Sequence, residues 1–115
     1  MIKRVSDYTI ITNSAETGLG NFEVKQLMNN SDLPPHMCMF AIVTIKPGEE
    51  CRYHKHEGDS EIYFIISGKA EYCDEGVTTL IGPGDTTCTY DGQSHSIRNI
   101  SDTDLIFAAV IPYTA

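Results

Sequence analysis

The chain has 115 residues, of which 41% are hydrophobic and 21% are charged, and this length and composition predict one globular domain, residues 1–115. No run of eighteen apolar residues occurs, which argues against a membrane span, and the net charge of −8 disfavours binding to the phosphate backbones of nucleic acids. The acidic balance favours solubility, and recruitment of a cationic partner is the alternative interpretation.

Residues 1–20 carry a weak pattern that is compatible with one or two peripheral strands. The chain soon turns polar after residue 1 and lacks the apolar stretch of a secretory signal, so a cytoplasmic location is expected. The four cysteines lie thirteen or more residues apart, and none forms a CxxC pair. They are therefore expected to be free thiols that serve as small apolar side chains.

Short runs rich in β-branched residues fill the rest of the chain, and turn residues separate them. Residues 29–35 contain two prolines and two asparagines, which predicts a loop, and residues 74–76 predict a hairpin turn. No helix is predicted, and the pattern indicates an all-β sandwich or barrel. The predicted strands are residues 21–28, 39–46, 52–56, 61–66, 70–73, 77–81, 86–90, 95–100 and 105–111.

Two histidines in one predicted strand carry the clearest chemical signal. His54 and His56 are separated by one residue, so alternation along a strand points both imidazoles to one face. Glu61 begins the next predicted strand after a turn-forming segment and can return to the same pocket. His95, far along the chain, can converge with them if the strands close into a barrel. Imidazole nitrogens with one carboxylate form a metal-binding set, and four ligands leave positions open in an octahedral shell.

The spacing of these residues resembles the cupin family. Its first motif, Gly-x(5)-His-x-His-x(4)-Glu-x(6)-Gly, matches residues 48–68 without a gap. Its second motif, Gly-x(5)-Pro-x-Gly-x(2)-His-x(3)-Asn, matches residues 84–99 except that Tyr90 replaces the proline. That position shapes a turn and is not a ligand, so the replacement affects the expected geometry of the loop and not the expected metal site. Many fixed positions at matching spacing make this resemblance specific.

The resemblance implies a single-domain, RmlC-like jelly-roll β-barrel, also called a double-stranded β-helix, with a metal ion inside. The implied ligands are His54, His56, Glu61 and His95, and the implied ion is one divalent transition metal per chain: Mn, Fe, Co, Ni or Zn. His36, which follows two prolines, is expected to have no metal role. Asn99, the last residue of the second motif, is expected to bond nearby backbone.

Strand alternation extends the pocket to two candidate substrate-binding residues, Arg52 and Tyr63. Arg52 shares a face with His54 if the strand is regular, and its guanidinium could bind a carboxylate. A salt bridge at the barrel rim is the alternative for Arg52, and a place in the core is the alternative for Tyr63. Cys51 is expected on the opposite face from His54.

Several functions stay open at this point. The family and Arg52 suggest a metal-dependent enzyme acting on a small organic acid, a sugar-derived acid or a dicarbonyl by isomerase, decarboxylase, lyase or dioxygenase chemistry. The alternative is a non-catalytic module that binds or senses a small metabolite. The ligand is expected to be anionic. A homodimer is also expected, with residues 1–30 as peripheral strands that contribute to the interface, because edge strands need covering.

Overall fold

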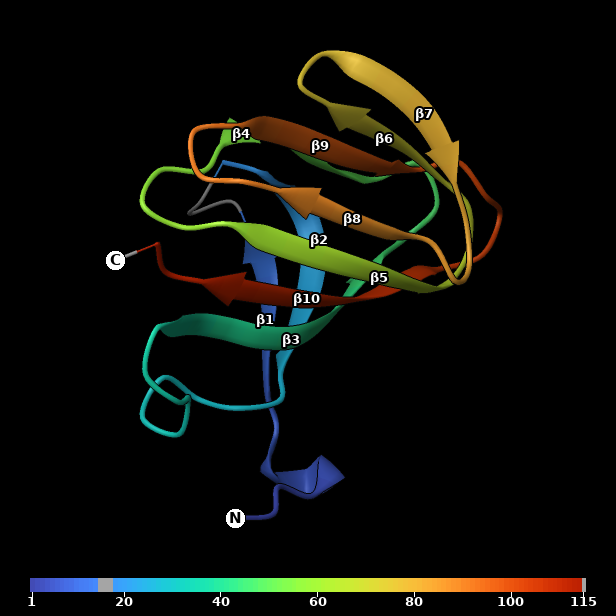
Figure 1. Cartoon of the computed structure of the whole chain (residues 1–115). Coiled ribbons are helices and arrows are strands. Elements are labelled where there is room, and N and C mark those ends of the chain that lie inside the picture. The colour runs from blue at the N-terminus through green and yellow to red at the C-terminus, as the bar shows by residue number, and fades with distance from the viewer. Residues whose placement is uncertain (15–17, 115) are drawn as a thin grey trace.

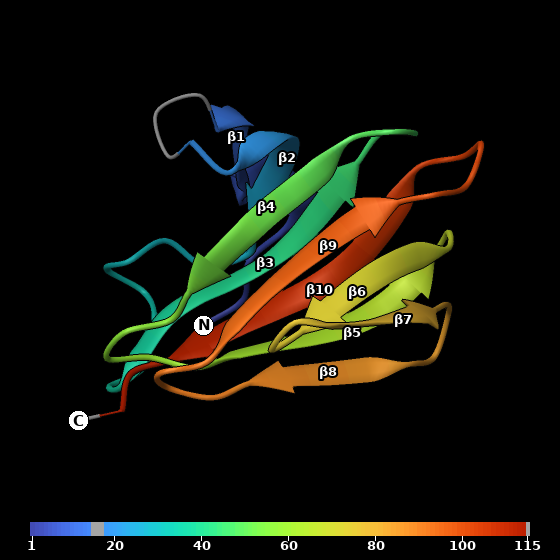
Figure 2. The same ribbon diagram turned by 90° about the horizontal axis from the view of Figure 1, so that it is seen from above.

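The protein is an all-β molecule built from two antiparallel sheets that lie face to face (Figures 1 and 2). The structure is a computed structural model that describes residues 1–14 and 18–114. One short 3-10 turn, Val5–Asp7, precedes the strands. Within the described ranges no helix is long and apolar enough to cross a membrane. The predicted all-β jelly roll is confirmed.

Ten strands make up the sheets of the described residues. The bounds of nine follow the predicted strands to within two residues, and the tenth, β1, lies in residues 1–20, where one or two peripheral strands were expected. The strands are β1 Thr9–Ser14, β2 Gly20–Gln26, β3 Met37–Ile45, β4 Glu50–Lys55, β5 Glu61–Ser67, β6 Ala70–Asp74, β7 Val77–Ile81, β8 Thr86–Thr89, β9 Ser94–Asn99 and β10 Leu105–Pro112. One sheet has the order β1-β2-β3-β10-β5-β8, and the other has the order β4-β9-β6-β7. The two sheets enclose the interior as a sandwich without forming one continuously hydrogen-bonded barrel within the described chain.

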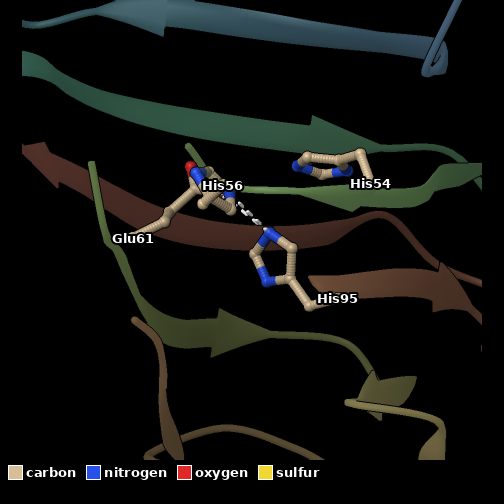
Figure 3. Close-up of side chains that lie close together, drawn as sticks. All are labelled: His54, His56, Glu61 and His95. Atoms are coloured by element: carbon tan, nitrogen blue, oxygen red, sulfur yellow. Dashed lines mark hydrogen bonds and ion pairs between the residues drawn. The ribbon is translucent and has the colours of Figure 1, made fainter. Parts of the chain in front are cut away.

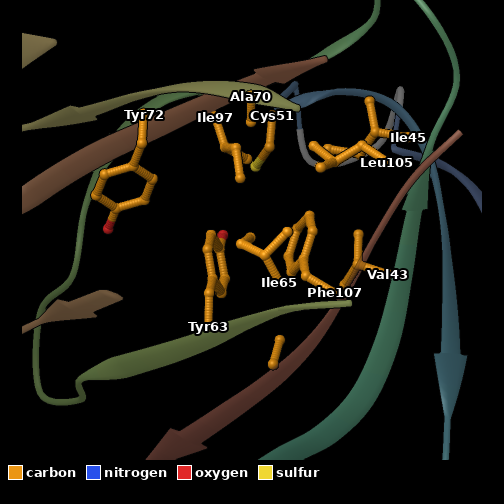
Figure 4. Close-up of a cluster of buried hydrophobic side chains, with 11 residues drawn as sticks. Val43, Ile45, Cys51, Tyr63, Ile65, Ala70, Tyr72, Ile97, Leu105 and Phe107 are labelled. Atoms are coloured by element: carbon orange, nitrogen blue, oxygen red, sulfur yellow. The ribbon is translucent and has the colours of Figure 1, made fainter. Parts of the chain in front are cut away.

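The hydrophobic core lies between the sheets, where inward side chains of both layers meet (Figure 4). Strand β5 shows the cause: Tyr63 and Ile65 are buried, whereas Ile62, Phe64 and Ile66 alternate with them and face outward. From the facing sheet, Cys51, Tyr72 and Ile97 point toward the same interior. Alternation along the strands therefore fixes which residues can reach a site inside the sandwich.

The outer face of the six-stranded sheet is also apolar. Ile62, Phe64 and Ile66 are 41–49% exposed there. Alternate residues of β10 and β3 are apolar as well, and register aligns Phe64 with Ala108 and Ala108 with Ile42. Antiparallel sheets that face water normally carry polar residues on their outer face, so this face has the composition of one that is covered.

Gly68, the last position of the first motif, is held in the left-handed region with φ of 91°. An added Cβ would lie 2.9 Å from both the Asp104 carbonyl oxygen and the Leu105 Cα. We therefore expect Gly68→Ala to lower the free energy of unfolding by about 2–4 kcal/mol, through backbone strain plus steric overlap. Gly84 has a φ of 90° with open space around it, so Gly84→Ala should cost only about 1 kcal/mol. Urea unfolding measures both, and equal losses would contradict the steric part.

Candidate metal centre

Four potential ligands lie close together in the structure (Figure 3). One ligand atom from each of His54, His56, Glu61 and His95 lies within 4.8 Å of the others. His95 is fully buried, His56 and Glu61 are 7% and 6% exposed, and His54 is partly buried. The structure thus brings together all four residues that the sequence singled out, from strands β4, β5 and β9 and the residue after β4.

The closest three atoms have the spacing of ligands around one ion. His56 Nε2 lies 3.0 Å from His95 Nε2 and 3.2 Å from Glu61 Oε1, and His95 Nε2 lies 3.1 Å from the same oxygen. Ligands bonded at about 2.1 Å to a metal and set at right angles lie about 3.0 Å from each other. The donor set therefore fits a first-row divalent ion in both chemistry and separation.

Hydrogen bonds behind the imidazoles orient two of them for binding a cation. His56 Nδ1 lies 2.7 Å from Asp59 Oδ1, and His54 Nδ1 lies 2.7 Å from the Arg52 carbonyl oxygen. Both partners can only accept, so each Nδ1 donates and each neutral ring keeps a free lone pair on Nε2. Neutral His56 then turns an acceptor toward the Glu61 carboxylate, and only a proton or a metal ion relieves that arrangement.

His95 is anchored by two hydroxyl groups from other strands. Its Nδ1 lies 2.7 Å from Tyr72 Oη and 2.8 Å from Thr89 Oγ1, and these two oxygens are 2.8 Å apart. The ring of Tyr63 stacks on the His95 ring with 5.2 Å between centroids. His95 is thus fixed in position by packing as well as by hydrogen bonds.

The electrostatic environment of the centre favours the ionised form of the Glu61 carboxylate, because its partners are cationic or carry a proton. Burial by itself would raise the pKa of Glu61, but the close approach of the His56 and His95 ring nitrogens, at 3.2 and 3.1 Å, lowers it to about 2. The hydrogen bond with Glu61 raises the pKa of His56, aided by Asp59, whereas burial lowers the pKa of His54. Glu61 is therefore ionised at neutral pH and available to a metal.

A bulge in β4 corrects the predicted facing of two residues. Cys51 pairs with Ile97 and His54 pairs with His95, so the interval in β4 is one residue longer than in β9. The extra residue reverses the alternation, and Cys51 and His54 both line the interior. The expectation that Cys51 lies on the opposite face from His54 is wrong.

Arg52 does not project into the cavity. Its predicted placement there is wrong because the bulge in β4 reverses its facing. It is exposed, and its Nη1 donates to the Gly18 carbonyl oxygen at 2.9 Å. The alternative prediction for Arg52 was a salt bridge at the barrel rim. Its guanidinium instead forms this hydrogen bond with the β1–β2 connection. A contact between Arg52 and a ligand therefore stays a prediction, and the position of the Arg52 side chain does not support it.

Tyr63 is both a core residue and a residue of the cavity wall, so its position is compatible with both of its predicted roles. It is 3% exposed, packs on Phe107 with 4.3 Å between ring centroids, and belongs to the core cluster. It also lines the cavity next to Glu61. Its role toward a ligand stays a prediction, and burial raises the pKa of its hydroxyl well above the ordinary value.

The turn that carries the departure from the second motif is intact. The Tyr90 backbone N–H donates to Gln93 Oε1 at 3.0 Å, and the Gln93 N–H donates to the Tyr90 carbonyl oxygen. Proline has no N–H for the first bond, so tyrosine offers this loop a hydrogen bond in its place. The Gly92 N–H then reaches the His56 carbonyl oxygen at 2.7 Å and ties the loop to the end of β4.

Asp59, Tyr72 and Thr89 were missed from the sequence. Asp59 occupies an unconstrained position inside the first motif, and nothing in its spacing marks it as a partner of His56. Tyr72 and Thr89 lie on β6 and β8 and meet His95 only through the packing of the sheets.

A cavity of about 510 Å³ opens onto the centre. His54, His56 and Glu61 line it, while His95 lies behind them. The apolar part of its remaining lining comes from β1, the β1–β2 connection, β2, β3, β4, β5 and β10, and Lys55, Glu57 and Asp59 add charged groups. A ligand in this cavity can therefore reach the cluster from one side only.

Burial in the cavity wall makes Cys51 a poor nucleophile. Burial, and then the charges of Glu61 and Glu50, raise the pKa of its thiol to about 12. The described cysteines are all free thiols, and the other three are partly exposed. We expect iodoacetamide at pH 8 to label Cys51 at least about a hundredfold more slowly than those three in the native protein. Mass spectrometry of timed samples measures this, with urea-unfolded protein as the control in which all four react. Equal native rates would contradict the assignment.

Comparison with known proteins places the chain in a family. The family model described as Cupin domain matches residues 41–111. An oxalate-binding protein of Thermotoga maritima is 39% identical over 94 residues, which cover 82% of this chain and 78% of that protein. The crystal structure of a Thermotoga maritima protein described as a predicted oxalate decarboxylase is 36% identical and has a TM-score of 0.88, covering 98% of this chain and 99% of that one.

More distant structures share the fold alone. An RmlC-like cupin from Shewanella frigidimarina is 18% identical with a TM-score of 0.76, covering 98% of this chain and 90% of that chain. The match of the family model over most of the chain, together with the Thermotoga relative, is sufficient for assignment: this chain is a small single-domain member of the cupin family.

Proposed function

We propose that this cupin binds one divalent transition metal ion through His54, His56, Glu61 and His95, and that the ion captures a small carboxylate. The observation that carries the proposal is the convergence of three imidazoles and one carboxylate, with ligand atoms within 4.8 Å of one another, beside a cavity. The set suits Mn, Fe, Co, Ni or Zn and does not select among them. Support for an anionic ligand comes from the names of the Thermotoga relatives, both of which refer to oxalate.

Each part of the site has a task in that function. A bound ion would supply a positive charge and Lewis acidity. Asp59 and the Arg52 carbonyl orient His56 and His54, while Tyr72 and Thr89 hold His95. The apolar walls limit water, which strengthens the attraction between the ion and a carboxylate.

Turnover of a small organic acid is the second candidate function. Four protein ligands leave two positions of an octahedral shell for a substrate, which is typical of reactive sites. Two acid–base groups beside the cavity are engaged, however: Asp59 bonds His56, and Glu61 belongs to the cluster. Binding is therefore the function that the geometry supports best, and decarboxylase-type or other chemistry is tested by metal-dependent turnover.

Calorimetry with oxalate tests the proposal. We expect metal-loaded protein to bind oxalate at least about a hundredfold more tightly than protein stripped with a chelator, because the ion supplies the anion site. Arg52→Ala should bind as the wild type does, since that guanidinium points away from the cavity. Equal oxalate affinity with and without metal would overturn the proposal.

We also propose that the chain forms a homodimer through the outer face of the six-stranded sheet, around Ile62, Phe64 and Ala108. A second copy offers the same apolar surface, so a two-fold axis across this face pairs like with like. Residues 1–30 would lie at the margin of such an interface, because β1 is the edge strand of that sheet. A cytoplasmic location stays a prediction.

Phe64→Lys is expected to convert the dimer to a monomer, because it places one charge from each copy at the centre of the interface. Leu80→Lys is the matched control, since Leu80 is 68% exposed on β7 of the other sheet. Sedimentation at micromolar concentration measures both. A monomeric wild type, or dissociation in the control as well, would contradict the proposed interface.

A further inference from the structure

The cavity beside the metal centre has an apolar chamber that the four ligands do not explain. Its wall away from the cluster is formed by Ile11 of β1, Phe22 and Val24 of β2, Met39 of β3 and Ile111 of β10. Register places Ile11 opposite Val24, and Val24 opposite Val43, so these side chains form one continuous row along the cavity, in which Ile11 is 46% exposed. This wall therefore comes from four adjacent strands of the six-stranded sheet.

The size of the cavity exceeds what a compact diacid needs. Its volume is about 510 Å³. Oxalate has six non-hydrogen atoms and occupies roughly the volume of three water molecules, about 90 Å³. An ion that holds only oxalate would leave most of the chamber without ligand contacts, and apolar walls gain little from water.

Charges around the chamber oppose a second, distant carboxylate. Apart from the histidines of the cluster, Lys55 is the one basic residue among the described lining residues, and its Nζ lies 3.6 Å from Glu57 Oε1. Glu57, Asp59 and Glu61 add negative charge to the same lining. A carboxylate held away from the ion would thus meet repulsion and no unpaired cation, whereas an apolar group would meet matching walls.

The N-terminal hairpin that forms the wall is fastened to β4, so the chamber is a built space. The Arg52 N–H donates to the Leu19 carbonyl oxygen at 2.6 Å, and the Arg52 guanidinium donates to the Gly18 carbonyl oxygen at 2.9 Å. Gly20 packs against the Glu50 carbonyl so closely that a Cβ would overlap it. These contacts fix the separation of β2 from β4 and keep the chamber open beside the ligands.

From this shape and charge, and from the two positions that four protein ligands leave open in an octahedral shell, we infer that the preferred ligand is a 2-oxo or 2-hydroxy monocarboxylate with a branched aliphatic or aromatic arm, which the chamber holds. The inference rests on the proposed function, because the carboxylate end depends on a bound ion. The arm adds affinity by leaving water for the row of Ile11, Phe22 and Val24. The size and apolar character of the arm, and not a second carboxylate on the ligand, then determine specificity.

Calorimetry of metal-loaded full-length protein tests the inference with pyruvate, 4-methyl-2-oxopentanoate, phenylpyruvate and oxalate as probes. Each buried CH2 is worth about fourfold in affinity, so 4-methyl-2-oxopentanoate should bind about fiftyfold more tightly than pyruvate. Ile11→Gln should reduce that ratio to about fivefold or less. Ile10→Gln is the matched control, because Ile10 is its neighbour on the outward face of the same strand and should keep the full ratio.

The outcomes separate the two proposals. Metal-dependent binding of pyruvate and oxalate without a gain from the larger arms would overturn this inference and leave the proposed function standing. Equal effects of Ile11→Gln and Ile10→Gln would also overturn it, and Ile111→Gln gives an independent second test of the wall. Carboxylate binding that does not depend on metal would overturn the proposed function and this inference together.

Discussion

Replacing His56 with alanine should remove most of the bound metal. His56 Nε2 is one of the three atoms that lie 3.0–3.2 Å apart, and the cluster has no fifth member among the described residues. We expect metal affinity to fall at least about a hundredfold, from close to one ion per chain in protein purified without chelator. Elemental analysis and metal titration measure this, and thermal unfolding adds a second measurement, since metal at a hundred times its Kd stabilises by about 2.7 kcal/mol.

Three further variants make the metal experiment specific. His54→Ala should behave as His56→Ala does. Asp59→Asn keeps all four ligands but weakens the partner of His56 Nδ1, so it should cost about tenfold to a hundredfold. His36→Asn is the control, because His36 is exposed and lies outside the cluster, and asparagine tolerates its φ of 69°. Full metal content in both His54→Ala and His56→Ala would refute the assignment.

Asn99→Ala should be the most destabilising substitution outside the core. Asn99 is 1% exposed, and its Nδ2 donates to the Ile45 and Thr103 carbonyl oxygens, each at 2.8 Å. Its Oδ1 accepts hydrogen bonds from the Ser101 N–H and hydroxyl. Alanine leaves buried backbone groups without partners, so we expect the free energy of unfolding to fall by about 3–5 kcal/mol.

Two related variants show whether the amide itself matters. Asn99→Asp keeps the shape but turns a carboxylate oxygen toward two carbonyl oxygens, so it should be as destabilising as alanine. Ser101→Ala removes one hydroxyl from the same group and should cost only about 1 kcal/mol. Urea unfolding at neutral pH compares the three, and a loss in Asn99→Ala no larger than in Ser101→Ala would contradict this account.

Local pattern was sufficient for most of the strands and for the membership of the metal cluster. Alternation and turn residues predicted strands at 61–66 and 86–90, and β5 and β8 occupy these positions within one residue. Motif spacing singled out His54, His56, Glu61 and His95, and the four converge. Asn99 bonds nearby backbone as expected. These features depend on residue order and period, which the sequence carries directly.

Tertiary packing decided the rest. A bulge between Cys51 and His54 reversed the facing of Arg52, and such an insertion depends on the register with β9, which no period within β4 reveals. Tyr72, Thr89 and His95 come from three strands and meet only when the sheets pack. The chamber exists because the hairpin of β1 and β2, which the sequence outlined only weakly, is fastened to β4 by the outward-facing Arg52. The sequence by itself thus determined which residues could hold a metal, whereas contacts between distant strands decided what lies beside it.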